Sequence, residues 1–211
     1  MAESTAQPRT PRGERTLARL LAAAEEVFAE KGFHGASVSD ITRRAGVGLG
    51  TFYFYFPGKL AIFREVVRSL SRELRRETAA AAAGAGDRVE AEKRAFTAFF
   101  RWSGRHRSLY RLLAQAEIVD PALAREYHES IARGYSRVLA EAQARGQVRA
   151  LDPETLAWCL IGAAEFVNRR WNLWEGKAPP PGVEEAVYQF LGVVLSPEPA
   201  GSAGQQRKDR R

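Results

Sequence analysis

The sequence predicts an all-α protein with a three-helix N-terminal head and a larger helical body, about nine helices in total. Apolar residues recur at helical spacing in almost every segment, for example at Leu17, Leu20, Leu21, Ala24 and Phe28. No stretch shows the strict alternation of a half-buried strand, and no internal repeat is present. The length of 211 residues is sufficient for one or two domains with a substantial core.

Changes in composition divide this helical chain. A polar start with Pro8, Pro11 and Gly13 and a polar end rich in Pro, Gly and Arg lack the apolar residues of a core. The Ala/Gly run at 79–87 is the clearest joint between domains. We therefore expect a disordered basic arm (1–13), a head (14–58), a linking helix (59–78), a body (88–195) and a disordered basic tail (196–211).

The stretch from Ser37 to Lys59 predicts two short helices joined by a tight turn. Gly46 can end the first helix because glycine takes the left-handed conformation without steric cost. The second helix runs from about Leu49 to Phe56, and Pro57-Gly58 ends it. This arrangement is typical of a helix-turn-helix, whose second helix can enter the major groove of DNA.

The side chains of this stretch resemble the TetR family of transcriptional repressors. The resemblance is strong from Arg15 to Phe63 and mostly architectural beyond that point. The matching residues are Phe33, Ser37, Ile41, Ala45, Gly46, Val47, Gly50, Thr51, Tyr53, Tyr55, Phe56 and Lys59. The structural alternative is an ordinary helical hairpin with a buried aromatic cluster. However, aromatic residues at 52–56 cover every face of the second helix, whereas a structural helix needs one apolar stripe.

The DNA contacts follow from the resemblance and from residue chemistry. Ser37 and Lys59 stand at helix N-termini, where backbone N–H groups favour a phosphate, although Ser37 can also be a cap and Lys59 a free surface lysine. Gly50 and Thr51, with Leu49 or Tyr53, are the candidates for base edges. Backbone contacts are expected from Thr42, Arg43, Arg44 and Tyr55.

The recognition helix departs from the usual family pattern at three positions. Family members often carry Ser at Gly48, a polar or basic residue at Leu49 and His at Phe54, and we keep these positions, Gly48 and Phe54 included, among the DNA-binding candidates. Arg9 and Arg12 of the predicted arm, with Arg15 just after it, could reach DNA phosphates or the minor groove, or remain solvated.

The second unit is expected to pair with a copy of itself and to bind an effector. In TetR-like proteins the last two helices form a four-helix dimer interface, and the linking helix relays ligand binding. A dimer suits a palindromic double-stranded operator, while a buried monomer core is the alternative. Gly162, Ala163 and Ala164 would allow close helix approach.

Aromatic residues in the body suit a small apolar effector, although each alone can be ordinary core packing. The candidate ligand-binding residues are Phe96, Phe99, Phe100, Trp102, Arg105, Tyr110, Arg111, Leu113, Tyr127, Ile131, Tyr135, Phe166, Arg170 and Trp171. The arginines would suit the phosphates of an acyl- or arylacyl-coenzyme A, and the body segments resemble repressors that sense such thioesters. A multidrug-type regulator is the alternative, with Glu117, Asp120 and Glu165 facing a cation.

Other classes of function have little support in the sequence. Three scattered histidines and the single Cys159 give no catalytic constellation, metal site or disulfide, so we expect neither an enzyme nor a cofactor, and Cys159 is expected to pack in a core. The absence of a secretory h-region or a long apolar run predicts a soluble, cytoplasmic protein without membrane contact. The net charge of +7 favours a polyanionic partner. A helical scaffold protein without DNA binding is the alternative from another class.

Overall fold

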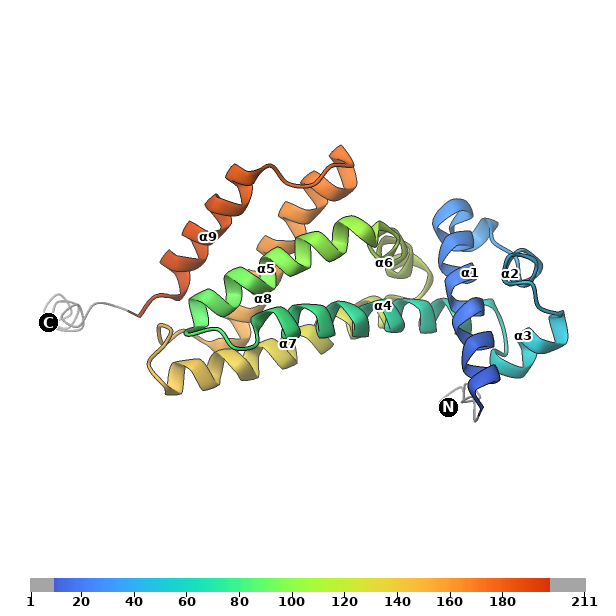
Figure 1. The fold of residues 1–211 in the computed structure, drawn as a ribbon, viewed down its shortest axis with the longest axis horizontal. Coiled ribbons are helices and arrows are strands. Elements are labelled where there is room, and N and C mark those ends of the chain that lie inside the picture. Colours follow the sequence, from blue (N-terminus) through green and yellow to red (C-terminus); the bar gives the residue numbers. More distant parts are fainter. Residues whose placement is uncertain (1–9, 198–211) are drawn as a thin grey trace, which may run out of the picture. The chain divides into compact units, whose positions relative to one another are not determined.

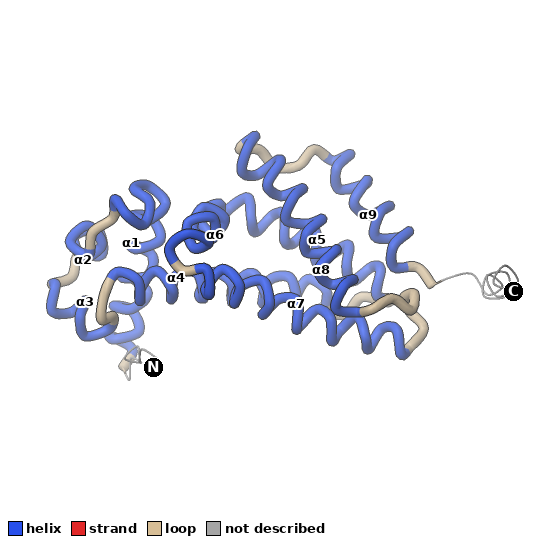
Figure 2. Tube along the Cα trace, turned by 180° about the vertical axis from the view of Figure 1, so that it is seen from behind, coloured by secondary structure: helices blue, strands red, loops and turns tan. Residues whose placement is uncertain are grey.

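The computed structural model describes residues 10–197, and all regular structure in that range is helical (Figure 2), which confirms the predicted all-α class. No helix in this range is long and apolar enough to cross a membrane. The elements, shown in Figure 1, are α1 (Pro11–Gly35), α2 (Val38–Ala45), α3 (Leu49–Tyr55), α4 (Lys59–Ala82), α5 (Arg88–Arg105), α6 (Arg107–Val119), α7 (Pro121–Ala144), α8 (Pro153–Asn168), the π-helix η1 (Arg169–Glu175) and α9 (Pro181–Leu195).

The chain forms two compact units. The head unit comprises Met1–Leu74 with His106–Glu129, and the body unit comprises Arg75–Arg105 with Ser130–Arg211. The long helices α4 and α7 therefore each contribute residues to both units. The prediction assigned all of 88–195 to the body, whereas the structure groups 106–129 with the head.

Contacts within the head unit explain this grouping. The backbone N–H of Phe33 donates to Gln115 Oε1 at 2.5 Å, and Ser108 Oγ donates to Glu25, which ties α6 to α1. Arg64 Nε lies 2.6 Å from Asp120 Oδ2, which joins α4 to the start of α7. These partners are far apart in sequence, so local patterns gave no signal for them. Asp120, one of the three acidic residues that the multidrug alternative placed opposite a cationic ligand, is therefore already paired with Arg64.

The head core is built from aromatic and aliphatic side chains of α1–α4. Phe28, Ile41, Phe52 and Phe63 have no exposed surface. The rings of Phe28 and Phe63 meet edge to face with centroids 5.2 Å apart. Edge-to-face pairs add specific attraction to the burial of large apolar surface. This core fixes the position of α3, which carries the candidate recognition residues.

Helix α1 begins earlier than the sequence predicted. Thr10 caps it by accepting from Gly13 N at 3.1 Å, and Pro11 takes the first helical position, where its missing N–H has no cost. Residues 11–13 of the predicted disordered arm are therefore helical, whereas the part of that arm before Thr10, with Arg9, lies outside the described residues, as does the predicted tail from 198 onward. Near the other end of α1, Gly32 has φ 69° and interrupts the helical backbone.

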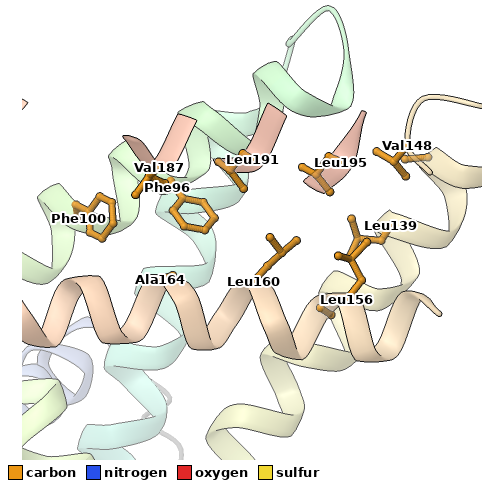
Figure 3. Close-up of a cluster of buried hydrophobic side chains, with 12 residues drawn as sticks. Phe96, Phe100, Leu139, Val148, Leu156, Leu160, Ala164, Val187, Leu191 and Leu195 are labelled. Carbon is orange, nitrogen blue, oxygen red and sulfur yellow. The ribbon is translucent and has the colours of Figure 1, made fainter. Parts of the chain in front are cut away.

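The core of the body unit lies between α5, α8 and α9 (Figure 3). Phe96 and Phe100 of α5 belong to one cluster of buried side chains with Leu160 and Ala164 of α8 and Val187 and Leu191 of α9. Helix α8 begins at Pro153, because Asp152 Oδ2 accepts from Thr155 N at 2.7 Å and proline is tolerated at the first helical position. At Arg169 the chain continues directly into the π-helix η1.

Candidate nucleic-acid interface

The turn between α2 and α3 is held by a glycine and an arginine. Gly46 has φ 63°, and Val47 N donates to Thr42 O at 3.1 Å. The Arg19 guanidinium donates to Ala45 O and, at 3.0 Å, to Gly46 O. A Cβ at Gly46 would lie 2.9 Å from Arg19 Nη2, so both backbone conformation and space require glycine here. The turn thus sets the direction in which α3 leaves α2.

A capping box fixes the start of α2. Asp40 N donates to Ser37 Oγ at 3.0 Å, and Ser37 N donates to Asp40 Oδ2 at 3.1 Å. Lys31 Nζ lies 2.8 Å from Asp40 Oδ1. Hydrogen bonds from Lys31 and then from Ser37 hold the pKa of the Asp40 carboxyl well below its usual range. The predicted cap at Ser37 is therefore confirmed, and its phosphate contact remains a proposal.

Helix α3 presents one buried and one exposed face. Phe52 and Tyr55 are buried, and Phe56, directly after the helix, is buried with them. On the outer face Tyr53 is 53% exposed and Phe54 67% exposed. The other outward positions are Gly48, Leu49 and Gly50, and no atom lies within 4 Å of a Cβ built at either glycine. Large exposed apolar side chains on a short helix indicate a contact surface.

Two predicted DNA contacts point inward. Tyr55 is buried, and its hydroxyl donates to Gly13 O at 3.2 Å, so it holds α3 against the first turn of α1. Thr42 is also buried, and its Oγ1 donates to Ser39 O at 3.2 Å. The prediction that these side chains contact phosphates is wrong for this structure, because both polar atoms are used to complete hydrogen bonding inside the head.

Two predicted phosphate-binding cations also have partners within the head. Lys59 Nζ donates to Phe33 O and Ala36 O, each at 2.7 Å, and thereby satisfies carbonyl groups left after the break at Gly32. Arg44 forms ion pairs with Glu26 and Glu30, each at 2.8 Å. These contacts raise the pKa of Arg44 further and lower that of Glu30. The alternative that Lys59 is a free surface lysine is therefore wrong, and the predicted phosphate contacts of Lys59 and Arg44 would compete with these partners.

An arginine-lined hollow lies beside α3 instead. It has a volume of about 590 Å3 and is lined by Arg12, Arg15, Thr16, Arg19, Gly46, Val47 and Thr51. The first four of these residues recur at three- and four-residue intervals, so they share one face of α1. The sequence analysis placed Arg12 on a disordered arm and Arg15 at the start of the head, and it missed Arg19 and Thr16. The periodicity of α1, extended back to Pro11, was the signal that could have found them.

Arg43 completes the exposed cationic groups of this surface. Its side chain is 78% exposed, and its Nη1 lies 3.6 Å from Asp40 Oδ1, a long and solvated ion pair. The arginines of the hollow and Arg43 flank α3 with donors that suit phosphate oxygens. The geometry therefore combines an outward apolar and glycine-containing helix with flanking guanidinium groups.

The sequence of this region matches a known family. The family model described as "Bacterial regulatory proteins, tetR family" matches residues 20–66, which contain α2 and α3. Over 189 residues, the chain is 30% identical to the uncharacterised HTH-type transcriptional regulator YdgC of Bacillus subtilis, covering 87% of this chain and 95% of that protein. The chain belongs to the tetR family of bacterial regulatory proteins.

Other relatives and solved structures agree with this assignment. The HTH-type transcriptional regulator EthR of Mycolicibacterium smegmatis is 26% identical, covering 95% of this chain and 99% of EthR. The structure of the fatty acid degradation regulator FadR from Bacillus halodurans has a TM-score of 0.74 at 22% identity, covering 88% of this chain and 96% of that chain. Salmonella enterica GusR has a TM-score of 0.73 at 23% identity, with 85% and 95% covered. Helix-turn-helix regulation of transcription is thus the shared activity of the curated relatives.

The predicted effector residues of this tetR-family chain fall in both units. Tyr110, Arg111, Leu113 and Tyr127 belong to the head unit. Those of the body unit are Phe96, Phe99, Phe100, Trp102, Arg105, Ile131, Tyr135, Phe166, Arg170 and Trp171. Phe96, Phe100 and Trp102 are buried, and the first two belong to the packed core of Figure 3.

Several residues predicted to line a pocket or core face outward. Phe166 is 69% exposed, because it lies two positions beyond the buried Ala164 and so on another side of α8. Cys159 is exposed on the same helix, so the prediction that it packs in a core is wrong. Arg105 is exposed, and Arg170 pairs with Glu175 and lies over the ring of Trp171. These positions form surface rather than the wall of an enclosed site.

A buried polar cluster in the body unit was missed by sequence analysis. Glu92 is 1% exposed and pairs with Arg88 one turn earlier on α5, and the Tyr135 hydroxyl donates to its carboxylate. Burial raises the pKa of Glu92, and it raises that of Tyr135 as well. Glu92 precedes the buried Phe96 and Phe100 at four-residue intervals, and this carboxylate within an apolar stripe was the available signal.

Proposed function

We propose that this tetR-family regulator is a homodimeric, ligand-responsive repressor that binds a palindromic operator in double-stranded DNA. The observation that carries the proposal is the outward face of α3 beside the arginine-lined hollow. Leu49, Tyr53 and Phe54 offer apolar contacts to thymine methyl groups, and Gly50 permits close approach of the backbone. Phosphate contacts come from Arg12, Arg15 and Arg43. Ser37 donates with both its N–H and its hydroxyl to Asp40, so a phosphate contact there would require the capping box to open. The proposed residues bind DNA, and the proposed repressor function includes no catalytic reaction.

Exposed apolar residues on α8 and α9 support the dimer. The two helices expose Trp158, Phe166, Phe190 and Val193, and the π-helix after α8 exposes Trp174. Large apolar side chains that are exposed on neighbouring helices suit an interface with another protein surface. A two-fold dimer would bring two copies of α3 to the two halves of a palindrome, which one short helix could not read with the same specificity.

The proposed effector is an acyl- or arylacyl-coenzyme A bound by the body unit. The aromatic side chains of α5 and the exposed Arg105 suit a ligand with an apolar end and phosphates. The structural neighbour from Bacillus halodurans is a regulator of fatty acid degradation, which supports this class of ligand. The multidrug alternative has less support, since Asp120 is paired with Arg64.

Effector binding would act on DNA affinity through the two helices that both units share. Arg64 and Arg68 of α4 pair with Asp120 and Glu126 at the start of α7, and both helices continue into the body unit. A shift of α4 or α7 caused by an effector would therefore be felt by the head. The effector must bind the released form more tightly than the DNA-competent form for this to occur.

The test is a titration of labelled operator DNA, obtained by selecting bound sequences from random duplexes. We expect binding to fall steeply with salt, and Arg12→Ala and Arg15→Ala each to reduce the salt slope by about one and weaken all sites alike. Arg137→Ala, an exposed arginine of α7, is the matched control and should have little effect. Coenzyme A thioesters should release the DNA. A salt-independent or undetectable interaction would indicate a scaffold protein, and release by cationic dyes alone would favour the multidrug alternative.

A further inference from the structure

The chain contains two asparagines, and both lie in the same buried stripe of the body unit. Asn168 is the last residue of α8, and Asn172 follows one turn later in η1. Their exposed fractions are 0% and 1%. They continue the four-residue series of buried Leu156, Leu160 and Ala164 on the side of α8 that faces α5. Two amides therefore occupy positions at which the preceding helix buries apolar side chains.

The hydrogen bonds of this pair determine the orientation of both amides. Asn172 Nδ2 donates to Phe100 O at 3.2 Å and to Asn168 Oδ1 at 2.7 Å. Because a carbonyl oxygen can only accept, the atom of Asn172 that faces Phe100 O must be the nitrogen. Because this nitrogen also donates to Asn168, the Asn168 side-chain atom that faces it must be the oxygen. The amide assignment thus follows from a backbone acceptor and does not depend on an arbitrary choice between two flipped forms.

One donor and one acceptor of the pair have no hydrogen-bond partner within the described residues. They are Asn168 Nδ2 and Asn172 Oδ1, and both atoms are buried. A buried polar group without a partner costs free energy, so such a group calls for a functional or structural explanation. The adjoining element η1 is a π-helix, a rare conformation that is frequent at functional sites. Two independent features therefore mark the same place.

The cations near this pair in sequence are engaged elsewhere. Arg170 pairs with Glu175, and Arg169 lies over the ring of Phe166, with its Cζ 5.8 Å from the centroid. Both arginines are exposed, whereas the asparagines are buried. A buried carboxylate would meet one amide donor and would be repelled by Asn172 Oδ1. A buried ammonium group would be attracted by Asn172 Oδ1 but repelled by the amide N–H groups of Asn168. Burying an unpaired charge of either sign also costs free energy.

We propose that the Asn168–Asn172 pair is the polar recognition element for an uncharged effector group that both donates and accepts a hydrogen bond, namely a carboxamide or a hydroxyl. Asn168 Nδ2 donates to its oxygen, and Asn172 Oδ1 accepts from its N–H or O–H. This inference rests on the proposed effector response and narrows its chemistry. The pantetheine arm of an acyl thioester carries such amides, whereas a free fatty acid carries a carboxylate and is excluded.

Binding of matched probes to the DNA-free protein tests this selectivity. Decanamide and decanol carry both a donor and an acceptor, methyl decanoate carries acceptors only, and decanoate and decylamine are charged. Calorimetry, with tryptophan fluorescence from Trp102 and Trp171 as a second readout, should give decanamide and decanol about tenfold tighter binding than the other three. Equal affinity for all five probes, or binding of none, overturns the inference.

Two variants separate recognition from structure. Asn168→Leu/Asn172→Leu removes both amides, so the melting temperature should stay the same or rise while the tenfold selectivity is lost. A fall in melting temperature with selectivity retained would show a purely structural, water-satisfied pair and would overturn the inference. Gln147→Leu, at a half-buried amide in the turn that follows α7, is the matched control and should leave selectivity unchanged.

Gly104→Ala provides a variant that should fold in any case. Alanine favours the helix, but its Cβ would lie 3.2 Å from Asn172 Oδ1 and would crowd the acceptor. We expect weaker binding of decanamide with unchanged helix content, and unchanged binding would contradict the inference.

The two proposals can also fail separately. If the amide selectivity is observed but no probe or coenzyme A thioester releases DNA, the proposed ligand response is wrong and the recognition chemistry stands. If thioesters release DNA from the wild type and from the double variant equally well, the ligand response stands and the amide inference is wrong.

Discussion

The recognition region of the head and the α8–η1–α9 region of the body differ in the side chains that they expose and in those that they bury. In the head, the outward side of α3 carries apolar side chains such as Tyr53 and Phe54 beside exposed arginines. In the body, α9 exposes Phe190 and Val193 and carries no lysine or arginine, while α8 and η1 each bury one asparagine. Exposed apolar groups beside cations suit DNA, and exposed apolar groups alone suit a second protein surface.

The two units also differ in the surroundings of a carboxylate, and therefore in the direction in which its pKa is shifted. Asp40 of the head is held in its charged form by Lys31 and Ser37 at the surface, so its pKa is lowered. Glu92 of the body is buried, and loss of hydration raises its pKa although Arg88 lies beside it. Surface ion pairs in the head fix the geometry of α2, whereas the body retains a charge that burial disfavours.

The largest expected effect concerns the two faces of α3. Phe52→Ala should lower the free energy of unfolding by about 3–5 kcal/mol, because it leaves a cavity in the head core. Phe54→Ala, on the exposed face, should change it by no more than about 0.5 kcal/mol while weakening DNA binding. Thermal unfolding and operator titration of both variants measure these effects. Equal destabilisation by the two variants would contradict the division of α3 into a core face and a contact face.

A smaller effect is expected at the exposed surface of α9. Val193 is 70% exposed, and Val193→Glu should weaken dimer association by about 2 kcal/mol, as expected for the loss of a central interface contact. Sedimentation equilibrium measures the association, and circular dichroism checks that helix content is kept. Ala140→Glu adds the same charge at an exposed position of α7 and should leave association unchanged. Unaltered dimerisation of Val193→Glu would place the interface elsewhere.

The smallest effect is a difference in pH dependence between Asp40→Asn and Glu92→Gln. The Asp40 pKa is lowered on folding, so the advantage of wild type over Asp40→Asn exists above the ordinary value of 3.8 and is lost as pH falls. The Glu92 pKa is raised from 4.5, so wild type gains relative to Glu92→Gln as pH falls, and this gain is lost as pH rises through the folded pKa. For each variant, chemical denaturation from acid to neutral pH gives the difference in unfolding free energy between wild type and variant. This difference should rise with pH for Asp40→Asn and fall with pH for Glu92→Gln, whatever its size at any one pH. Slopes of the same sign would contradict the contrast between the two carboxylates.

The sequence by itself determined the helical class, most helix ends and the recognition segment. The predictions for Gly46 and for the Ser37 cap are correct because each depends on backbone conformation and on groups a few residues away. Leu49 and Tyr53 are exposed, and their contact with bases stays a prediction. These are local properties, and short-range steric and hydrogen-bonding rules are sufficient for them.

Only the tertiary structure decided which polar atoms are already hydrogen-bonded inside the protein and which are left for DNA or a ligand. Lys59 and Tyr55 sit in the family motif, yet carbonyl groups of Phe33 and Gly13, remote in sequence, accept their hydrogen bonds. The grouping of 106–129 with the head and the burial of Asn168 likewise depend on which helices pack together. A helical pattern indicates that one face is buried, but the partner that covers this face, and the polar atoms it supplies, are set by contacts between distant segments.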